Sequence, residues 1–223
     1  MKSLNRYVLT DELYTLLKEQ IKKHQLAPGE KINIDQLART LQVSNIPIRE
    51  VLSRLVSEGL VKTVPFKGMF VTGITLQELD EIMEIRLELE TLAVRLSIPH
   101  IPDFEITSNL NELQKYDAQP TTSIDERLSL LIRMNENVHG LILQHCGNQM
   151  LRQLIRQYIE RIERYLSFIP GELDANTLRH ERTEHELIVR ALSTRNVQQA
   201  VEAMRNHLLL SHQRTRVFFS PNP

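Results

Sequence analysis

The sequence has a single cysteine, Cys146, so it cannot form an intrachain disulfide framework. It lacks any apolar run near the roughly 20 residues that a membrane-spanning helix requires. Its N-terminal stretch also lacks the unbroken apolar core of a signal peptide, because Asp11, Glu12 and Lys18 interrupt it. From these absences we expect a protein of the reducing cytoplasm with no membrane partner.

The 223 residues have almost no net charge, with a formal value of −1, but the charged residues are unevenly distributed. Residues 1–75 carry 11 lysines and arginines against 7 acidic residues, whereas the remainder carries 16 against 21. This asymmetry suggests that a small basic part contacts a polyanion and a larger acidic part does not. The length allows one large domain or two small ones, and the 41% hydrophobic content is typical of a globular protein.

The segment after Val43 has the pattern of a helix with one face in a core. Apolar residues recur there at Ile48, Val51, Leu52, Leu55 and Val56, which is helical spacing. The polar face carries Asn45, Arg49 and Ser53, and Ser44 is expected to cap the N-terminus. An anchored helix that presents polar residues near its N-terminus is what reading a DNA groove requires.

The neighbouring segments complete a recognisable arrangement. Helices are expected at 9–24 and 33–41, and Pro47 fits only within the first turn of the helix that follows them. Two β-rich runs, 60–64 and 69–72, then flank a turn at Pro65–Gly68. Three helices and a hairpin predict a winged helix-turn-helix over residues 1–73. Lys67 and Gly68 at the hairpin tip suit contact with a phosphate or the minor groove.

Residues 74–223 are helical in pattern throughout. A capping sequence at Thr75–Glu78 opens a helix to about residue 97, and further helices are expected at 105–116, 122–145, 148–168, 175–193 and 196–218. The fold is therefore predicted to be mainly α, with an all-α helical bundle as its second domain.

Three histidines of this bundle have a spacing that predicts a shared site. Asn135 and His139 lie four apart and share a helix face. His185 and His207 lie at equal distances from Asn196, so an antiparallel hairpin places them level with each other. Converging imidazoles with a nearby oxygen suit a divalent metal, although eight histidines also offer accidental pairs. Three glutamates beside His185 are expected to form a solvated helix face: Glu181, Glu184 and Glu186.

The first domain closely resembles the DNA-binding domain of GntR-family transcriptional regulators. The residues that carry this resemblance are Leu26–Lys31, Leu37-Ala38, Val43-Ser44, Pro47–Leu52, Leu55, Glu58-Gly59-Leu60 and Gly68. The second domain resembles the FadR-type, or FCD, ligand-binding domain through Arg86, Leu89-Glu90, Asn135, His139, Gly147-Asn148, Glu184-His185, Ala203-Met204 and His207-Leu208.

The resemblance implies a homodimer that binds double-stranded DNA at a palindromic operator and responds to a small carboxylate effector. It also implies a metal held by one aspartate and three histidines. The matching positions here are Asn135, His139, His185 and His207, so an amide replaces the usual carboxylate. The expected metal is Zn²⁺, with Ni²⁺ or Mn²⁺ as alternatives. Arg86 is a candidate for binding the effector carboxylate, or alternatively for an ion pair with Glu90.

Within the DNA-binding domain the sequence departs from the family at Asn45, where Arg is common, and at Ile46, where Thr is common. Because Asn favours adenine and Arg favours guanine, we predict an altered operator base opposite Asn45, unless Asn45 contacts only phosphate. Ile46 is suited to a thymine methyl, Arg49 to guanine or phosphate, and Ser44 to phosphate. Further candidates for the DNA backbone are Arg39, Arg54, Lys62 and Lys67.

The main hypothesis is thus a ligand-responsive bacterial transcriptional regulator that is not an enzyme. One alternative is a metal-dependent hydrolase with an accessory DNA-binding domain, since three histidines and an open position suit activated water. A second alternative is a regulator that senses metal or acts without an organic effector.

Overall fold

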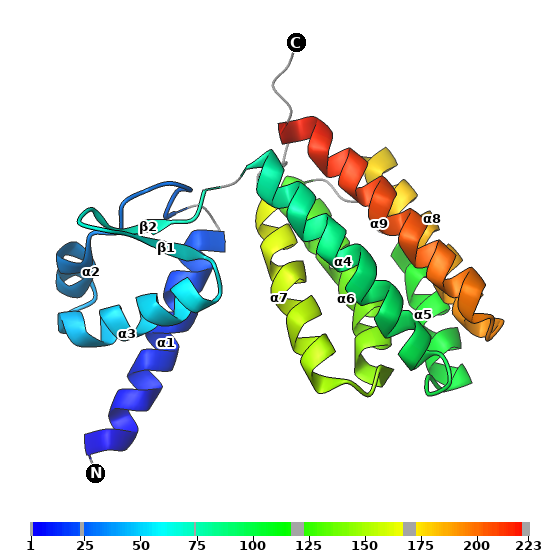
Figure 1. The fold of residues 1–223 in the computed structure, drawn as a ribbon, viewed down its shortest axis with the longest axis horizontal. Coiled ribbons are helices and arrows are strands. Elements are labelled where there is room, and N and C mark those ends of the chain that lie inside the picture. Colours follow the sequence, from blue (N-terminus) through cyan, green and yellow to red (C-terminus); the bar gives the residue numbers. More distant parts are fainter. Residues whose placement is uncertain (1, 23–24, 74, 117–122, 167–172, 220–223) are drawn as a thin grey trace. The chain divides into compact units, whose positions relative to one another are not determined.

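The computed structural model describes residues 2–22, 25–73, 75–116, 123–166 and 173–219 of the chain. The chain divides into two compact units, Met1–Ile74 and Thr75–Pro223, each with its own core. The first unit contains three helices and a two-stranded sheet, and the described residues of the second form helices alone (Figure 1).

The N-terminal unit has the expected helix and strand order. Its elements are α1 (Lys2–Lys22), α2 (Ile34–Thr40), α3 (Asn45–Ser57), β1 (Val61–Val64) and β2 (Gly68–Val71). The strands are antiparallel, with Val61 opposite Val71 and Val64 opposite Gly68. This is a winged helix-turn-helix, as predicted, with α3 in the place of the recognition helix.

The apolar stripe of α3 anchors this helix in the core of the unit. Ile48, Val51, Leu52 and Leu55 are fully buried, and Leu17 of α1 is buried with them. Burying such a side chain contributes about 1.5–3 kcal/mol each. The recognition helix is therefore held by its apolar face, and its polar face stays available.

The helix starts in this unit are only partly as expected. Asn33 caps α2, because its Oδ1 accepts a hydrogen bond from Gln36 N at 3.0 Å. Ser44 occupies the N-cap position of α3 but makes no capping hydrogen bond through its side chain. The prediction that the Ser44 hydroxyl caps α3 is therefore wrong, and the exposed hydroxyl is open to an external partner. The first helix also begins earlier than predicted, at Lys2 rather than near residue 9.

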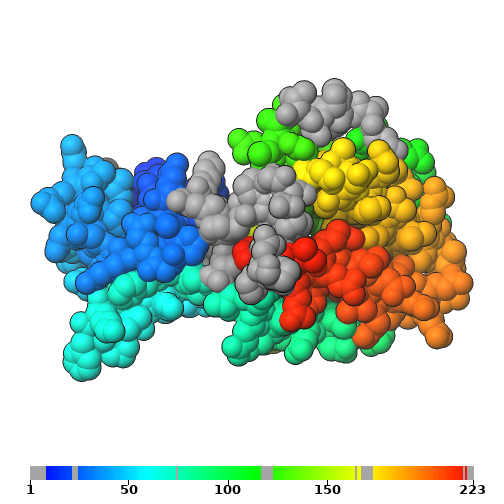
Figure 2. All heavy atoms as spheres, turned by 90° about the horizontal axis from the view of Figure 1, so that it is seen from above, coloured from blue at the N-terminus to red at the C-terminus, as the bar shows by residue number. Residues whose placement is uncertain are grey.

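Within the described residues, the C-terminal unit is built from six helices. They are α4 (Leu76–Ser97), α5 (Asp103–Lys115), α6 (Ile124–His145), α7 (Gln149–Leu166), α8 (Ala175–Ser193) and α9 (Val197–Phe219). α4 packs against α9, α7 and α6, while α8 packs against α9, α5 and α6. Figure 2 shows the red and orange atoms of α9 beside those of α8 on the surface of this unit. No helix in the described part of the chain is long and apolar enough to cross a membrane.

Candidate functional site

The outward face of α3 carries most of the side chains expected to contact DNA. Ile46 is 59% exposed, and Ser44 and Arg49 are also exposed. Pro47 is different, since it is buried against the core. Its role as a contact residue is therefore not supported, because its buried ring shapes the first turn of α3 instead.

Asn45 is held in place by the preceding helix. Its Nδ2 donates a hydrogen bond to Asp35 Oδ1 at 2.7 Å. Asp35 thereby orients the amide group, and the contact of this amide with adenine stays a prediction. This contact crosses the turn between α2 and α3, and sequence spacing alone does not predict it.

The arginine candidates divide into exposed and engaged ones. The Arg54 guanidinium lies 3.6 Å from the centre of the Tyr14 ring and bonds Asp11 Oδ1 at 3.1 Å. Arg54 thus contacts α1, its side chain is 51% exposed, and its contact with the DNA backbone stays a prediction. Arg39 is exposed, and its Nε donates to the Asp35 carbonyl at 3.2 Å, which leaves its outer guanidinium nitrogens available.

The tip of the β1–β2 hairpin is basic. Lys62 and Lys67 are exposed, and the Lys67 amide donates to the Val64 carbonyl at 3.1 Å to close the turn. Lys31 lies beside Gly68, whose φ of +106° favours glycine. Lys67 in the turn, Lys31 beside Gly68 and Lys62 opposite Phe70 thus make the hairpin basic, in keeping with the predicted phosphate contact.

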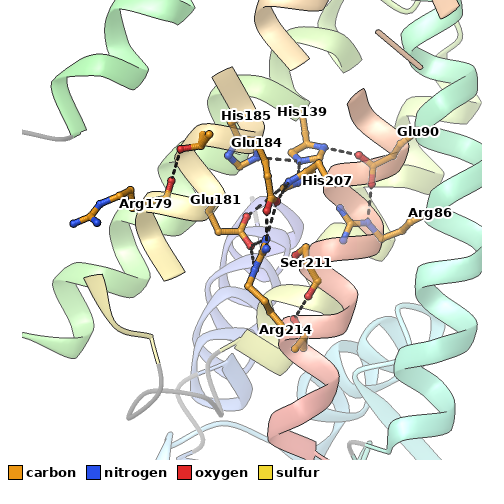
Figure 3. A network of polar contacts seen from close by, with 12 residues as sticks. Arg86, Glu90, His139, Arg179, Glu181, Glu184, His185, His207, Ser211 and Arg214 are labelled. Carbon is orange, nitrogen blue, oxygen red and sulfur yellow. Dashed lines mark hydrogen bonds and ion pairs between the residues drawn. The ribbon is translucent and has the colours of Figure 1, made fainter. Parts of the chain in front are cut away.

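In the C-terminal unit, α6, α8 and α9 bring His139, His185 and His207 together in the interior. Figure 3 shows the three rings facing one another. His139 Nε2 lies 3.2 Å from His207 Nε2 and 3.4 Å from His185 Nε2. All three side chains are at most 2% exposed. The spacing about Asn196 therefore led to the right grouping of histidines.

Carboxylates on neighbouring helices fix the orientation of two of these rings. His139 Nδ1 donates to Glu90 Oε2 at 2.5 Å, and Glu90 Oε1 accepts from Arg86 Nε at 2.7 Å. His207 Nδ1 donates to Glu184 Oε2 at 3.0 Å. A proton on each Nδ1 places a lone pair on each Nε2, which is the atom turned toward the other rings.

Glu184, the carboxylate that bonds His207, belongs to a further polar network next to the three histidines (Figure 3). Arg214 of α9 bonds Glu184 Oε1 at 2.6 Å and Glu181 Oε1 at 2.6 Å. The side chains of Glu181, Glu184 and Glu186 are 6%, 12% and 17% exposed, so the expectation that they form a solvated face is wrong. Glu186 Oε1 accepts a hydrogen bond from Arg182 Nη1 at 2.5 Å. The sequence could not reveal this network, because Arg214 lies 30 residues or more from both carboxylates.

Burial and charge set the protonation states of the cluster. Desolvation lowers the pKa of His139, and it lowers that of His185 well below 6.5. Desolvation acts to raise the pKa of Glu90, but its interactions with the Arg86 guanidinium and with the His139 ring outweigh it and bring that pKa to about 2. The site thus consists of two neutral imidazoles beside an ionised carboxylate, which is the state that favours metal ligation.

The separations of the ring nitrogens fit a metal ligand set. Three nitrogens at roughly 2.0–2.1 Å from one tetrahedral Zn²⁺ lie about 3.3 Å from each other. The observed 3.2 and 3.4 Å agree with this value. Lone pairs that face each other in a dry interior repel, and His185 Nδ1 finds no hydrogen-bond partner among the described residues. A cation between the three Nε2 atoms would remove this repulsion.

Two predicted participants stand apart from this core of three. Asn135 lies one turn before His139 on α6 and is half-buried, so its place as a fourth ligand stays a prediction. Arg86 is 6% exposed and forms the ion pair with Glu90, which was the alternative to an effector contact.

Cys146 is buried, and its Sγ donates to the Asn148 carbonyl at 3.6 Å.

Two family models match the chain, one for each unit. Residues 9–71 match bacterial regulatory proteins of the gntR family, and residues 81–210 match the FCD domain. The chain belongs to the GntR family. Its members are transcriptional regulators that bind DNA and usually act as dimers, and they are not enzymes. The alternative of a metal-dependent hydrolase is therefore wrong.

Similar proteins agree with this assignment over nearly the whole chain. The HTH-type transcriptional regulator YdhC of Bacillus subtilis (strain 168) is 31% identical over 89% of this chain and 85% of its own length. The Nta operon transcriptional regulator of Aminobacter aminovorans is 32% identical over 73% of this chain and 74% of its own. The solved structure of E. coli McbR/YncC has a TM-score of 0.72 at 23% identity, covering 95% of this chain and 99% of its own, which supports the fold.

Proposed function

We propose that this GntR-family protein is a ligand-responsive transcriptional regulator whose helical unit senses a small carboxylate through a bound divalent metal. The observation that carries the proposal is the convergence of three Nε2 atoms, two of them in rings that carboxylates hold at Nδ1. Because the proposed partner is DNA, the bacterial cytoplasm is the proposed location.

His139, His185 and His207 would hold the metal, and Asn135 is proposed as a neutral oxygen ligand one turn from His139. Zn²⁺ fits three imidazoles best, while Ni²⁺ and Mn²⁺ are the alternatives. When bound, the metal supplies a Lewis-acidic position that a carboxylate of the effector can occupy. Arg86 acts on this site through Glu90 and His139, and its direct contact with the effector remains part of the proposal.

Elemental analysis of the purified full chain tests the metal site. We expect one equivalent of metal in the wild type and its loss in His185→Ala, because His185 is one of the three imidazoles that converge in the described part of the bundle. His180→Ala is the matched control, since His180 lies on the same helix but is exposed. Wild-type protein that retains no metal and shows no thermal shift with Zn²⁺, Ni²⁺ or Mn²⁺ contradicts the site.

A thermal-shift panel of small carboxylates tests the sensing role. We expect at least one acid to stabilise the metal-loaded protein and to lose that effect after chelation. Binding at 100 times the Kd stabilises a protein by about 2.7 kcal/mol. If no acid shifts the loaded protein, the alternative of a metal-sensing or effector-independent regulator replaces this proposal.

A homodimer is proposed because the outer face of α4 carries an apolar stripe. Ile85, Leu92 and Leu96 are 40%, 38% and 38% exposed, and Leu89 lies between them. The stripe is symmetric about the point midway between Leu89 and Leu92. In an antiparallel pair of α4 helices, Ile85 of one copy would therefore meet Leu96 of the other, as a two-fold axis requires.

The charges beside the stripe have the same self-complementarity. Exposed Glu84 lies near its N-terminal end and exposed Arg95 near its C-terminal end, so an antiparallel copy brings opposite charges together. We expect Leu92→Glu to convert a dimer to a monomer in light scattering. Leu187→Glu on α8, at 57% exposure, should leave the mass unchanged. A Leu92→Glu protein that remains dimeric excludes this face.

A dimer would place two copies of α3 at the spacing of a palindromic operator. Selection of bound duplexes from a random pool tests this expectation and identifies the operator. We expect two inverted half-sites, with adenine opposite Asn45 and thymine near Ile46. The effector changes operator affinity only if effector and DNA favour different states of the dimer, so titration of the selected duplex with and without effector measures the coupling.

A further inference from the structure

The tip of the β1–β2 hairpin carries an aromatic side chain that the protein itself leaves uncovered. Phe66 has a relative exposure of 109%, the highest value among the large hydrophobic residues that the structure describes as exposed. It lies in the middle of the three residues that join Val64 to Gly68, the last pair of the hairpin. No packing within the N-terminal unit accounts for a phenylalanine at this position.

The backbone at this position is also unfavourable for a phenylalanine. Phe66 has φ of +61°, in the left-handed region that glycine and asparagine occupy readily. A non-glycine residue pays about 1–2 kcal/mol to remain there. Asparagine or glycine at residue 66 would stabilise the turn and remove the exposed ring. Phe66 combines an unfavourable backbone conformation with an apolar ring exposed to water. This combination indicates a binding role for the ring.

The turn fixes the backbone that carries this ring. Pro65 fixes its own φ, and the Lys67 amide closes the turn on the Val64 carbonyl at 3.1 Å. The ring has two side-chain torsions, so little conformational entropy is lost when it is buried by a partner. The tip therefore presents a pre-ordered apolar probe.

The charges around the probe identify the kind of partner. Lys31, Lys62 and Lys67 are exposed, and residues 60–73 include no acidic side chain. Lys67 follows Phe66 in the turn, the Cε of Lys31 lies 3.5 Å from the place of a Cβ at Gly68, and Lys62 is opposite Phe70 in the hairpin. An apolar probe on a basic hairpin matches the minor groove of a duplex, where phosphates line both edges and stacked bases form the floor.

We infer that Phe66 is a wedge that enters the minor groove beside each operator half-site, inserts between two base pairs and partly unstacks them. The inference rests on the proposed binding of an operator by α3 and adds a second point of contact to it. Pyrimidine–purine steps are the expected targets, because they unstack most easily. The wedge would kink the duplex toward the major groove, and the three lysines would hold the flanking phosphates.

The test uses the full-length protein and the duplex selected with it, with 2-aminopurine at the flanking step. In the wild type we expect binding, a rise in 2-aminopurine fluorescence and a bend measured by energy transfer between the duplex ends. Phe66→Ala should lower affinity about tenfold and remove both signals without changing the salt dependence. Phe66→Leu should restore part of each, since leucine also acts as a wedge.

Two further variants separate the wedge from general effects. Lys67→Ala should lower the salt slope by about one while preserving the fluorescence rise, because it loses one phosphate contact. Phe104→Ala removes a phenylalanine of α5 that is 72% exposed, and should change neither binding nor fluorescence. Melting curves should be the same for wild type and Phe66→Ala, because an uncovered ring contributes no packing.

The outcomes distinguish the wedge from operator binding itself. If Phe66→Ala binds the selected duplex with wild-type affinity and the same fluorescence rise, the wedge is excluded while operator binding stands. If Phe66→Ala loses affinity but the wild type itself gives no fluorescence rise, insertion is also excluded. If no duplex is selected and the wild type binds none, the proposed operator binding fails and the wedge fails with it.

Discussion

The two units keep their functional side chains in opposite environments. Ile46 and Arg49 of α3 are exposed, whereas His139, His185 and His207 are almost completely buried in the bundle. On α3 the apolar stripe supports the fold and the opposite face is available to a partner. In the bundle the same side chains must serve the fold and the ligand, because each buried polar group requires a partner.

This difference predicts how each unit tolerates substitution. A change on the outer face of α3 should alter binding and leave stability almost unchanged. A change in the buried network should alter stability first, because it leaves a charge without its partner. The following experiments test that contrast, in order of decreasing effect.

Arg86→Ala should have the largest effect on stability. The Arg86–Glu90 pair has side chains 7% and 3% exposed, so the variant leaves a buried carboxylate beside His139 without its cation. We expect a loss of about 3–5 kcal/mol in the free energy of unfolding, measured with urea. Arg205→Ala is the control, because its pair with Glu88 is exposed and should contribute less than about 1 kcal/mol. Equal effects would mean that burial does not decide how much an ion pair of this unit contributes to stability.

Arg49→Ala should weaken operator binding by about 1–3 kcal/mol and change stability by less than about 0.5 kcal/mol. Arg49 is exposed on α3, so its loss leaves no cavity. Anisotropy titrations with the selected duplex measure the affinity, and melting curves measure the stability. Arg190→Ala, an exposed arginine of α8, should change neither. Unchanged operator affinity in Arg49→Ala excludes Arg49 from the DNA interface.

Acidification should destabilise the bundle after metal has been removed by a chelator. Burial depresses the pKa values of His139 and His185 below 6.5, so the unfolded chain takes up protons first as the pH falls. Their contribution to stability is complete above about pH 6.5 and is lost as the pH falls toward the folded pKa values. Each histidine adds at most about 1.4 kcal/mol per pH unit.

Urea unfolding between about pH 7.5 and pH 5.5 measures this dependence. His185→Gln should flatten the curve, since it removes one of the two titrating groups. A stability that rises on acidification would show that the cluster is not neutral in the folded protein.

Asp35→Ala should have the smallest effect on stability and a specific effect on recognition. It removes the acceptor that holds Asn45 Nδ2 at 2.7 Å, so the amide is free to turn. We expect a change within about 1 kcal/mol in stability and a relaxed preference for adenine in duplex selection. Gln36→Ala, on the same exposed helix, is the control. An unchanged preference would mean that α3 alone orients Asn45.

Most of the fold could be predicted because its signals are local. The apolar spacing of Ile48, Val51, Leu52 and Leu55 predicted α3, and the turn between Val64 and Gly68 predicted the hairpin. Helix ends in the bundle lie within a few residues of the predicted breaks. The Ser44 cap failed for a reason that a sequence cannot supply, since residue type indicates a capping position but not the direction of the hydroxyl.

The candidate site was predictable only in part. His139, His185 and His207 were found through symmetric spacing and resemblance, but the groups that orient them were not. Glu90, Glu184 and Arg214 approach the triad through the packing of α4, α8 and α9, which no periodicity encodes. Arg54 was assigned to DNA because its charge is visible in the sequence, whereas its stacking on Tyr14 is not.

The hydrogen bonds from His139 and His207 to carboxylates also affect how fast a bound metal would exchange. To turn away from a bound metal, each of these rings would have to break its bond to Glu90 or Glu184 in a dry interior. A metal bound there would exchange slowly, over times far longer than a change in metabolite level. Such a metal would be acquired once and retained through many rounds of effector binding. Metal supply would then set how many regulators are competent, and the metabolite would set what each one does.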